Sequence, residues 1–232
     1  MKPYTYLIIN LACIAIPFLA SFYKKYPFYK EWKYFLSANF IVSSIFILWD
    51  IYFTKLQVWG FNSEYLLGIN IFNLPVEEIL FFICIPYACV FTYFVFKKYL
   101  STNIFSKKNY SLLINVLILL MVISSLLFFK KMYTFYTSIF LLLTLLFVKF
   151  KRINISVIII SYLAITPFFF ISNGILTGSI IDNPIVWYDD SQNLSFRLFT
   201  IPIEDAFYGF LLITLNCILF DYVKHKSLKE KM

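Results

Sequence analysis

The stretch Asn73-Leu74-Pro75-Val76-Glu77-Glu78 leads directly into the apolar run Ile79–Phe96. A second copy of the pattern, Thr200-Ile201-Pro202-Ile203-Glu204-Asp205, leads into the apolar run Ala206–Tyr222. In both copies two adjacent acidic residues stand at the edge of a run long enough to cross a bilayer. Acidic residues are rare there, because a carboxylate at the centre of a span costs about 2.5–3.5 kcal/mol. The repeated acid pair therefore predicts a membrane protein built from a repeat, with these four carboxylates at its functional centre.

The composition supports an integral membrane protein. Of the 232 residues, 61% are hydrophobic and 14% are charged, whereas a soluble domain has roughly 25% charged residues. The net charge of +8 could suggest a nucleic-acid partner. However, the basic residues lie in short segments between apolar runs, which is typical of membrane topology, so we expect no nucleic acid.

Neither cysteine nor histidine indicates a metal site. The four cysteines fall inside apolar runs without the spacing of metal ligands, and we expect them to be small buried residues: Cys13, Cys84, Cys89 and Cys217. The single histidine, His225, lies in a basic tail. The sequence therefore predicts no bound metal.

Seven apolar runs have about the 20 residues that a helix needs to cross ~30 Å of hydrocarbon. We predict spans at Tyr4–Phe22, Tyr34–Phe53, Pro75–Phe96, Ser111–Phe129, Met132–Val148, Ile153–Ser172 and Pro202–Tyr222. Lysines follow the first run closely, which fits a retained span better than a cleaved signal peptide. The pair Lys130–Lys131 is all that separates the fourth and fifth runs, so a tight helical hairpin and a single bent segment both remain open.

The distribution of basic residues predicts the orientation. With an outside N-terminus, fifteen of the twenty Lys and Arg residues fall in cytoplasmic segments and five in outer segments. Cytoplasmic loops carry the excess of positive charge in membrane proteins. We therefore expect the N-terminus outside and the C-terminus inside, in a membrane that we expect to be the bacterial cytoplasmic membrane.

Spans one to three correspond to spans five to seven, and the fourth helix lets both triplets point the same way. We divide the chain into a first three-helix repeat (1–96), a linking helix with its connections (97–131) and a second three-helix repeat (132–232). Each triplet has a long outer loop with a tryptophan, Trp59 sixteen residues before Pro75 and Trp187 fifteen before Pro202. Parallel repeats are related by an axis along the membrane normal, which would place both acid pairs at one depth. Such long loops are usually functional, although the tryptophans could equally mark the membrane interface.

Helix capping explains part of the motif. Proline is favoured at the first helical position, which would place Glu77 and Glu204 third. A glutamate there can bind a free backbone N–H and is stabilised by the helix dipole. Capping does not explain Glu78 and Asp205, which point about 100° around the helix. All four carboxylates are therefore candidate catalytic groups.

The string Leu74-Pro75-Val76-Glu77-Glu78-Ile79-Leu80-Phe81-Phe82 resembles the signature of the small membrane lycopene cyclases. These are the two-subunit bacterial type, the fused archaeal and bacterial forms, and the cyclase part of a fungal bifunctional enzyme. The second half of the chain resembles the partner subunit over Asn173–Gly178, Pro184, Val186–Tyr188 and Ile201–Phe210. The resemblance covers nearly the whole chain, which looks like a fused form.

The resemblance implies an enzyme that closes the linear ends of lycopene, or a related linear carotene, into β-ionone rings without net redox change. Its partners would be membrane lipid and other carotenoid enzymes. The family's acidic motif carries over onto Glu77, Glu78, Glu204 and Asp205 with Pro75 and Pro202. We expect six residues to bind substrate: Pro75, Pro202, Trp59, Asn173, Trp187 and Tyr208. Aromatic faces can stabilise a cation, and the available rings are those of Phe81, Phe82, Trp59, Trp187 and Tyr208. Asp50 is a weaker candidate, because the span before the second motif has no acidic counterpart.

This chemistry needs one protonated carboxyl, which protonates the terminal alkene, and one nearby anion that stabilises the resulting cation. Glu77 and Glu204 lie at the capping position and should be the anions, whereas Glu78 or Asp205 should be the acid. The five glycines form no dinucleotide-binding pattern after a strand, and the sequence shows no strand pattern. We therefore expect no flavin or nicotinamide cofactor.

Two other functions remain open, and a third is excluded. A hydratase would capture the same cation with water. A small transporter can also have a three-plus-one-plus-three arrangement of helices. Matching helix-breaking prolines would then be expected in the first span of each triplet, but span one has Pro17 and span five has no proline. A seven-helix retinal protein needs a lysine in its last span, and residues 203–222 contain none.

Overall fold

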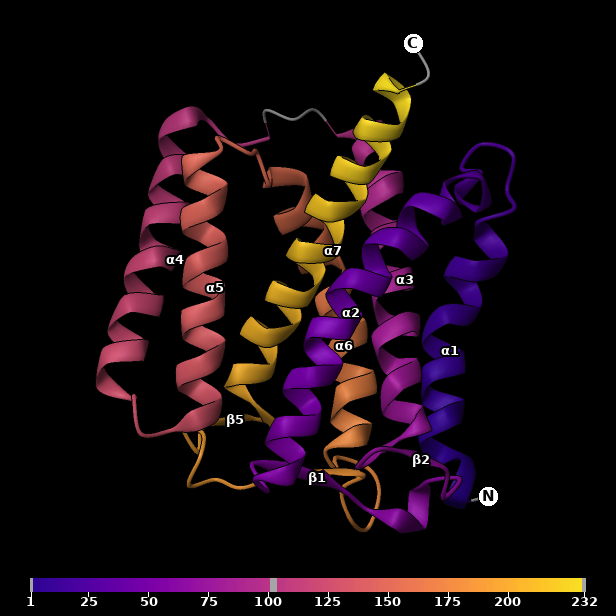
Figure 1. Cartoon of the computed structure of the whole chain (residues 1–232), viewed down its shortest axis with the longest axis vertical. Coiled ribbons are helices and arrows are strands. Elements are labelled where there is room, and N and C mark those ends of the chain that lie inside the picture. The colour runs from indigo at the N-terminus through magenta and orange to yellow at the C-terminus, as the bar shows by residue number, and fades with distance from the viewer. Residues whose placement is uncertain (1, 101–103, 231–232) are drawn as a thin grey trace.

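Seven long helices run side by side through the molecule (Figure 1). The computed structural model describes residues 2–100 and 104–230. The helices are α1 (Thr5–Ala20), α2 (Trp32–Lys55), α3 (Val76–Tyr99), α4 (Lys107–Leu127), α5 (Met132–Phe150), α6 (Ser156–Leu176) and α7 (Ile203–Lys229). All seven are long and apolar enough to cross a membrane. The prediction of an all-α integral membrane protein with seven spans is confirmed.

The outer faces of the helices are apolar, and the contacts between helices include buried polar groups. Phe40, for example, is 75% exposed on α2, as suits a side chain that faces lipid. On the inner face of the same helix, the Asn39 amide donates hydrogen bonds to the Phe82 carbonyl (3.0 Å) and to the Asn216 side chain (3.2 Å). Such bonds matter because lipid supplies no hydrophobic drive for helix association, and each contributes about 0.6–2 kcal/mol.

The fourth and fifth spans form a tight helical hairpin. Helix α4 ends at Leu127, α5 begins at Met132, and the two pack along each other on one side of the molecule (Figure 1). The Lys131 ammonium, at the turn, donates to the carbonyl of Asn193 in the second outer loop. Of the two alternatives left open by the sequence, the structure has two separate helices joined at Lys130–Lys131, and not one bent segment.

The two triplets exchange their middle helices. Helix α1 packs on α3, and α5 packs on α7, each within its own triplet. In contrast, α2 packs more extensively on α7 than on α3, and α6 packs more extensively on α3 than on α7. Any site between α3 and α7 is therefore built from both halves of the chain.

The outer loops contain three small antiparallel strand pairs that the sequence did not predict. Strand β1 (Trp59–Phe61) pairs with β4 (Val186–Tyr188) across the two repeats. Strand β2 (Asn70–Ile71) pairs with β3 (Leu74–Pro75), and β5 (Arg197–Leu198) with β6 (Ile201–Pro202). Strands of two or three residues are too short to show the alternation on which strand prediction depends.

The strand pairs in front of α3 and α7 repeat with a constant offset of 127 residues. Asn70 pairs with Pro75 in the first copy, and Arg197 pairs with Pro202 in the second. Positive φ angles recur with the same offset, at Gly68 and Ser195. The repeat inferred from the acid pairs thus extends to the backbone of the loops.

Prolines 75 and 202 lie one position earlier than predicted. Each immediately precedes its helix in an extended conformation, with ψ of 147° and 140°, and the helices begin at Val76 and Ile203. The acid pairs still lie in the first turn. Different definitions of a helix end disagree by one to two residues, and the difference here is no larger.

The β1–β4 pair lies on the pseudo-two-fold axis that relates the repeats. Gly60 pairs directly with Trp187, its own equivalent under the 127-residue offset. Trp59 pairs instead with Tyr188, so the two tryptophans that the sequence suggested as equivalent are not. The Trp187 ring lies against Gly60, where a Cβ atom would come within 2.3 Å of ring carbon Cζ2.

Candidate functional site

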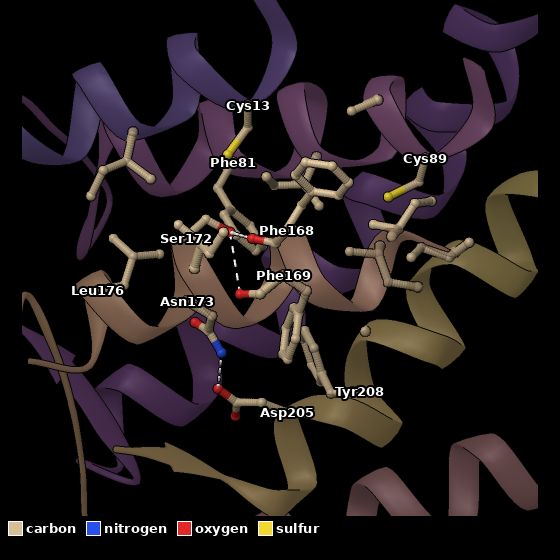
Figure 2. Close-up of a pocket in the computed structure, with 18 of the residues that line it drawn as sticks. Cys13, Phe81, Cys89, Phe168, Phe169, Ser172, Asn173, Leu176, Asp205 and Tyr208 are labelled. Atoms are coloured by element: carbon tan, nitrogen blue, oxygen red, sulfur yellow. Dashed lines mark hydrogen bonds between the residues drawn. The ribbon is translucent and has the colours of Figure 1, made fainter. Parts of the chain in front are cut away.

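A cavity of about 720 Å³ lies between α1, α3, α6 and α7, beneath strands β1 and β4 (Figure 2). Its walls are mainly apolar, but three carboxyl groups reach it: Asp50 from α2, Glu78 from α3 and Asp205 from α7. Large apolar pockets with a few converging polar groups are typical of ligand sites. We call these three side chains the acid cluster.

Glu78 belongs to a buried pair of carboxyl groups. The Tyr6 hydroxyl, on α1, donates to Glu78 Oε2. The Asp50 carboxyl also lines the cavity and interacts electrostatically with Glu78, and its Oδ1 accepts a hydrogen bond from Trp59 Nε1. Glu78 is 8% exposed and Asp50 1%. Two buried carboxyl groups close to each other repel strongly when both are ionised, which favours a state with one proton on the pair.

Asp205 has different surroundings. Three side chains donate to its carboxyl oxygens: Tyr133 at 2.6 Å, Asn173 at 2.7 Å and Tyr188 at 3.0 Å, of which the Asn173 bond is drawn in Figure 2. Burial, followed by the charge of Asp205, raises the pKa of Tyr188 well above its usual range, so this phenol stays protonated and donates. Three donors aimed at one carboxyl favour its ionised form.

The two deeper acids are held by equivalent residues of the two repeats. Tyr6 precedes Glu78 by 72 residues, and Tyr133 precedes Asp205 by 72. The second helix of each repeat contributes a further contact, through Asp50 in α2 and through Asn173 in α6. Asn173 is therefore the counterpart of Asp50, with an amide in place of the acid. Because Asn173 is not acidic, the sequence shows no acidic counterpart of Asp50 in the second repeat.

Glu77 and Glu204 are buried but lie outside the lining of the cavity. Glu77 Oε1 accepts a hydrogen bond from the backbone N–H of Leu67 (2.7 Å), and Glu204 Oε1 accepts one from Leu194 N–H (2.8 Å), each ten residues earlier. Thr134 also donates to Glu204, at 2.6 Å. The sequence predicted that these glutamates would bind N–H groups of their own helices. They bind the preceding outer loop instead.

Tyr208 lies among the rings that line the acid cluster. It is one turn after Asp205 on α7, and the rings of Trp49 and Trp59 lie 5.0 and 6.4 Å from its own, both T-shaped. Tyr208 and Trp59 line the cavity, as do Asn173 and Phe81. The other proposed binding residues do not: Trp187 is 39% exposed above Gly60, and Pro75, Pro202 and Phe82 lie outside the lining.

Sequence reasoning did not identify Tyr6, Tyr133 or Tyr188. The chain has 18 tyrosines, and nothing in composition distinguishes these three. A signal was present for two of them, because Tyr6 and Tyr133 keep the same spacing to the deeper acids. Aligning the repeats over their first helices would have shown it.

The family model described as lycopene cyclase matches residues 3–96 and 130–223. Among curated proteins, the bifunctional lycopene cyclase/phytoene synthase of Arthroderma gypseum is 35% identical over 50 residues. This match covers 22% of the chain and 8% of that relative, so the chain spans only a small part of its length. No solved structure matches the chain. The family model covers both three-helix repeats and omits α4, and the chain therefore belongs to the lycopene cyclase family.

Proposed function

We propose that the protein closes the ends of a linear carotene, such as lycopene, into β-ionone rings by acid–base catalysis without net redox change. It would then be an isomerase. The observation that carries the proposal is the acid cluster. In it a buried carboxyl pair, Asp50 and Glu78, and a carboxyl held by three donors, Asp205, face one apolar cavity.

The two environments suit the two proton transfers of ring closure. Glu78 gives the shared proton to the terminal alkene, which leaves a tertiary cation. The neighbouring double bond attacks this cation and forms the ring, and Asp205 removes one proton to leave the ring alkene. One proton is added and one is lost, so the product is an isomer of the substrate. Groups whose surroundings favour opposite protonation states are the general pattern for such paired roles.

The apolar and aromatic walls favour a ring over a hydrated product. The faces of Tyr208 and Trp59 can stabilise the cation by cation–π attraction. Most of the remaining lining is aliphatic or phenylalanine, and such walls hold little water that could capture the cation. The family assignment and these walls together support cyclisation over hydration.

The test is pigment analysis of cells that make lycopene and express the chain. We expect ring-bearing carotenes, with solvent deuterium in each new ring when the reaction runs in heavy water. Glu78→Gln and Asp205→Asn should each lower ring formation by about 10²–10⁴-fold, the usual contribution of a general acid or base. Glu64→Gln makes the same chemical change on the exposed outer loop and should be silent.

Two results would contradict the proposal. The first is normal ring formation by the combined Glu78→Gln and Asp205→Asn variant at the parent amount of inserted protein. The second is a hydroxylated open-chain product in place of rings, which would assign a hydratase. We also propose that no flavin or nicotinamide is needed, so purified protein washed free of nucleotides should turn over lycopene in vesicles.

A further inference from the structure

The cavity at the acid cluster has a pseudo-symmetric equivalent. A second cavity, of about 420 Å³, lies between α2, α5 and α7, which correspond to α6, α1 and α3. Lining residues of the two cavities match in pairs, such as Cys13 with Phe140 and Ala88 with Leu215 at the 127-residue offset. Between the middle helices, α2 and α6, equivalent residues are 123 positions apart, as Asp50 and Asn173 are. This offset matches Trp49 in the second cavity with Ser172 in the first.

Small side chains keep the first cavity open. Cys13 on α1 and Ser172 on α6 both line it (Figure 2). Ala88 on α3 lines the same cavity. We call Cys13 and Ser172 the entrance pair.

Large rings fill the equivalent place in the second cavity. Phe140 and Trp49 have centroids 5.0 Å apart in a T-shaped contact. Trp49 also contacts the Tyr208 ring at 5.0 Å, so it forms a wall between the second cavity and the acid cluster. Among the described residues, none of the acid cluster lines the second cavity. We call Phe140 and Trp49 the closing pair.

The first cavity opens sideways. Three of its lining residues are also strongly exposed on the outer surface: Ile16 on α1 (77%), and Phe168 (71%) and Ile171 (64%) on α6. In a membrane these side chains face lipid. The lining follows α3 from Glu78 to Phe96, which is roughly 27 Å at ~1.5 Å per residue. A long, narrow apolar molecule therefore fits lengthwise.

We propose that a linear carotene reaches the acid cluster from the lipid between α1 and α6, past the entrance pair, and that the closing pair blocks the equivalent route between α2 and α5. This proposal rests on the proposed function for the identity of the substrate. The helices around the two routes are equivalent in the two repeats. The routes therefore differ in width because the side chains at equivalent positions differ in size. Cys13 and Ser172 are then the residues that set which molecules enter.

Exchanging side chains between the two routes tests the proposal. Cys13→Phe and Ser172→Trp reproduce the closed side, and we expect each to lower ring formation at least tenfold per inserted protein. The mirror variant Phe140→Cys changes the same pair of residue types on the other route and should keep the parent level. Lycopene retained by the purified protein, measured by its absorbance, should fall in parallel with ring formation in the two blocking variants.

The outcomes separate this proposal from the proposed function. If the parent forms no rings, the proposed function fails, and retained lycopene still tests the entrance. If Cys13→Phe and Ser172→Trp insert normally, retain lycopene and form rings at the parent rate, the entrance is elsewhere. Loss of ring formation in Phe140→Cys as large as in Cys13→Phe would show that the effect is not specific to the route between α1 and α6, and would contradict the proposal. Should the bulky variants insert poorly, Ala88→Leu, which reproduces Leu215, makes the same test with a smaller change.

Discussion

Adjacent acids in each motif have separate tasks. Glu77 and Glu204 hold the outer loops through backbone N–H groups, whereas Glu78 and Asp205 face the cavity. A hydrogen bond to a charged group contributes about 1.5–3 kcal/mol, and one between neutral groups about 0.5–1.5. We therefore expect Glu77→Gln and Glu204→Gln to lower the free energy of unfolding by about 1 kcal/mol.

Thermal unfolding in detergent would measure this loss, with Glu64→Gln as the control. Ring formation per folded protein should fall less than in Glu78→Gln. A Glu77→Gln variant with the parent's stability but no ring formation would reverse the division of tasks between the two acids.

Asp50 provides a second prediction. An amide at this position would donate a hydrogen bond to Glu78, as Asn173 does to Asp205, and would favour the ionised form of Glu78 over the proton donor. We expect Asp50→Asn to reduce ring formation by about 10–10²-fold, within the range for general acid catalysis, with normal insertion. Asn173→Asp, made in the same background, should not restore it, because the proton would then lie beside Asp205. If the Asp50→Asn variant is fully active, Glu78 does not need the Asp50 carboxyl to remain protonated.

At this scale the sequence predicted the acids but not their partners. The four carboxylates were recognisable because charge is costly at the edge of a span. The roles of Tyr6 and Tyr133 depend on contacts between distant helices, which no local pattern records. Asp50 was a weaker candidate in the sequence, and only the fold places it beside Glu78 in the cavity. Asn173 was expected from resemblance alone, and its hydrogen bond to Asp205 supplies a physical reason for it.

Among the elements, the β1–β4 pair ties the two repeats together above the cavity. Because the Trp187 ring lies against Gly60, Gly60→Ala must displace the ring. Overpacking of this kind typically costs about 1–3 kcal/mol. We expect lower thermal stability in Gly60→Ala and partial recovery in the double variant with Trp187→Ala. Additive effects of the two substitutions would show that the contact does not matter.

The spans were predictable as elements, because length and hydropathy determine a membrane helix. The exchange of middle helices was not predictable, because nothing in the sequences of α2 and α6 indicates which helices they pack against. The short strands in the outer loops escaped prediction for a related reason. The β1–β4 pair depends on contact between loops that are far apart in sequence. The other two pairs are local, but their strands have only two residues each and show no alternation.

For the whole molecule, the distribution of lysines predicts an outside N-terminus. Helix α4, which starts at Lys107, begins at the opposite end of the helices from strand β1 (Figure 1), and Asp190 follows β4, the partner of β1. Reporter fusions at these positions should give a cytoplasmic signal for Lys107 and an external one for Asp190. The same compartment for both would contradict the seven-span arrangement, and an exchange of the two would invert it.

The closing pair also has a kinetic consequence. With the single acid cluster of the described residues in the first cavity, a rigid polyene can present one end at a time. A product with two rings then requires dissociation and return in the opposite direction. Catalysis should therefore be distributive. In a pulse–chase experiment with isotopically labelled lycopene, excess unlabelled one-ring carotene added early should keep most of the label from reaching the two-ring product. Label that passes to two rings undiluted would mean that the enzyme works processively.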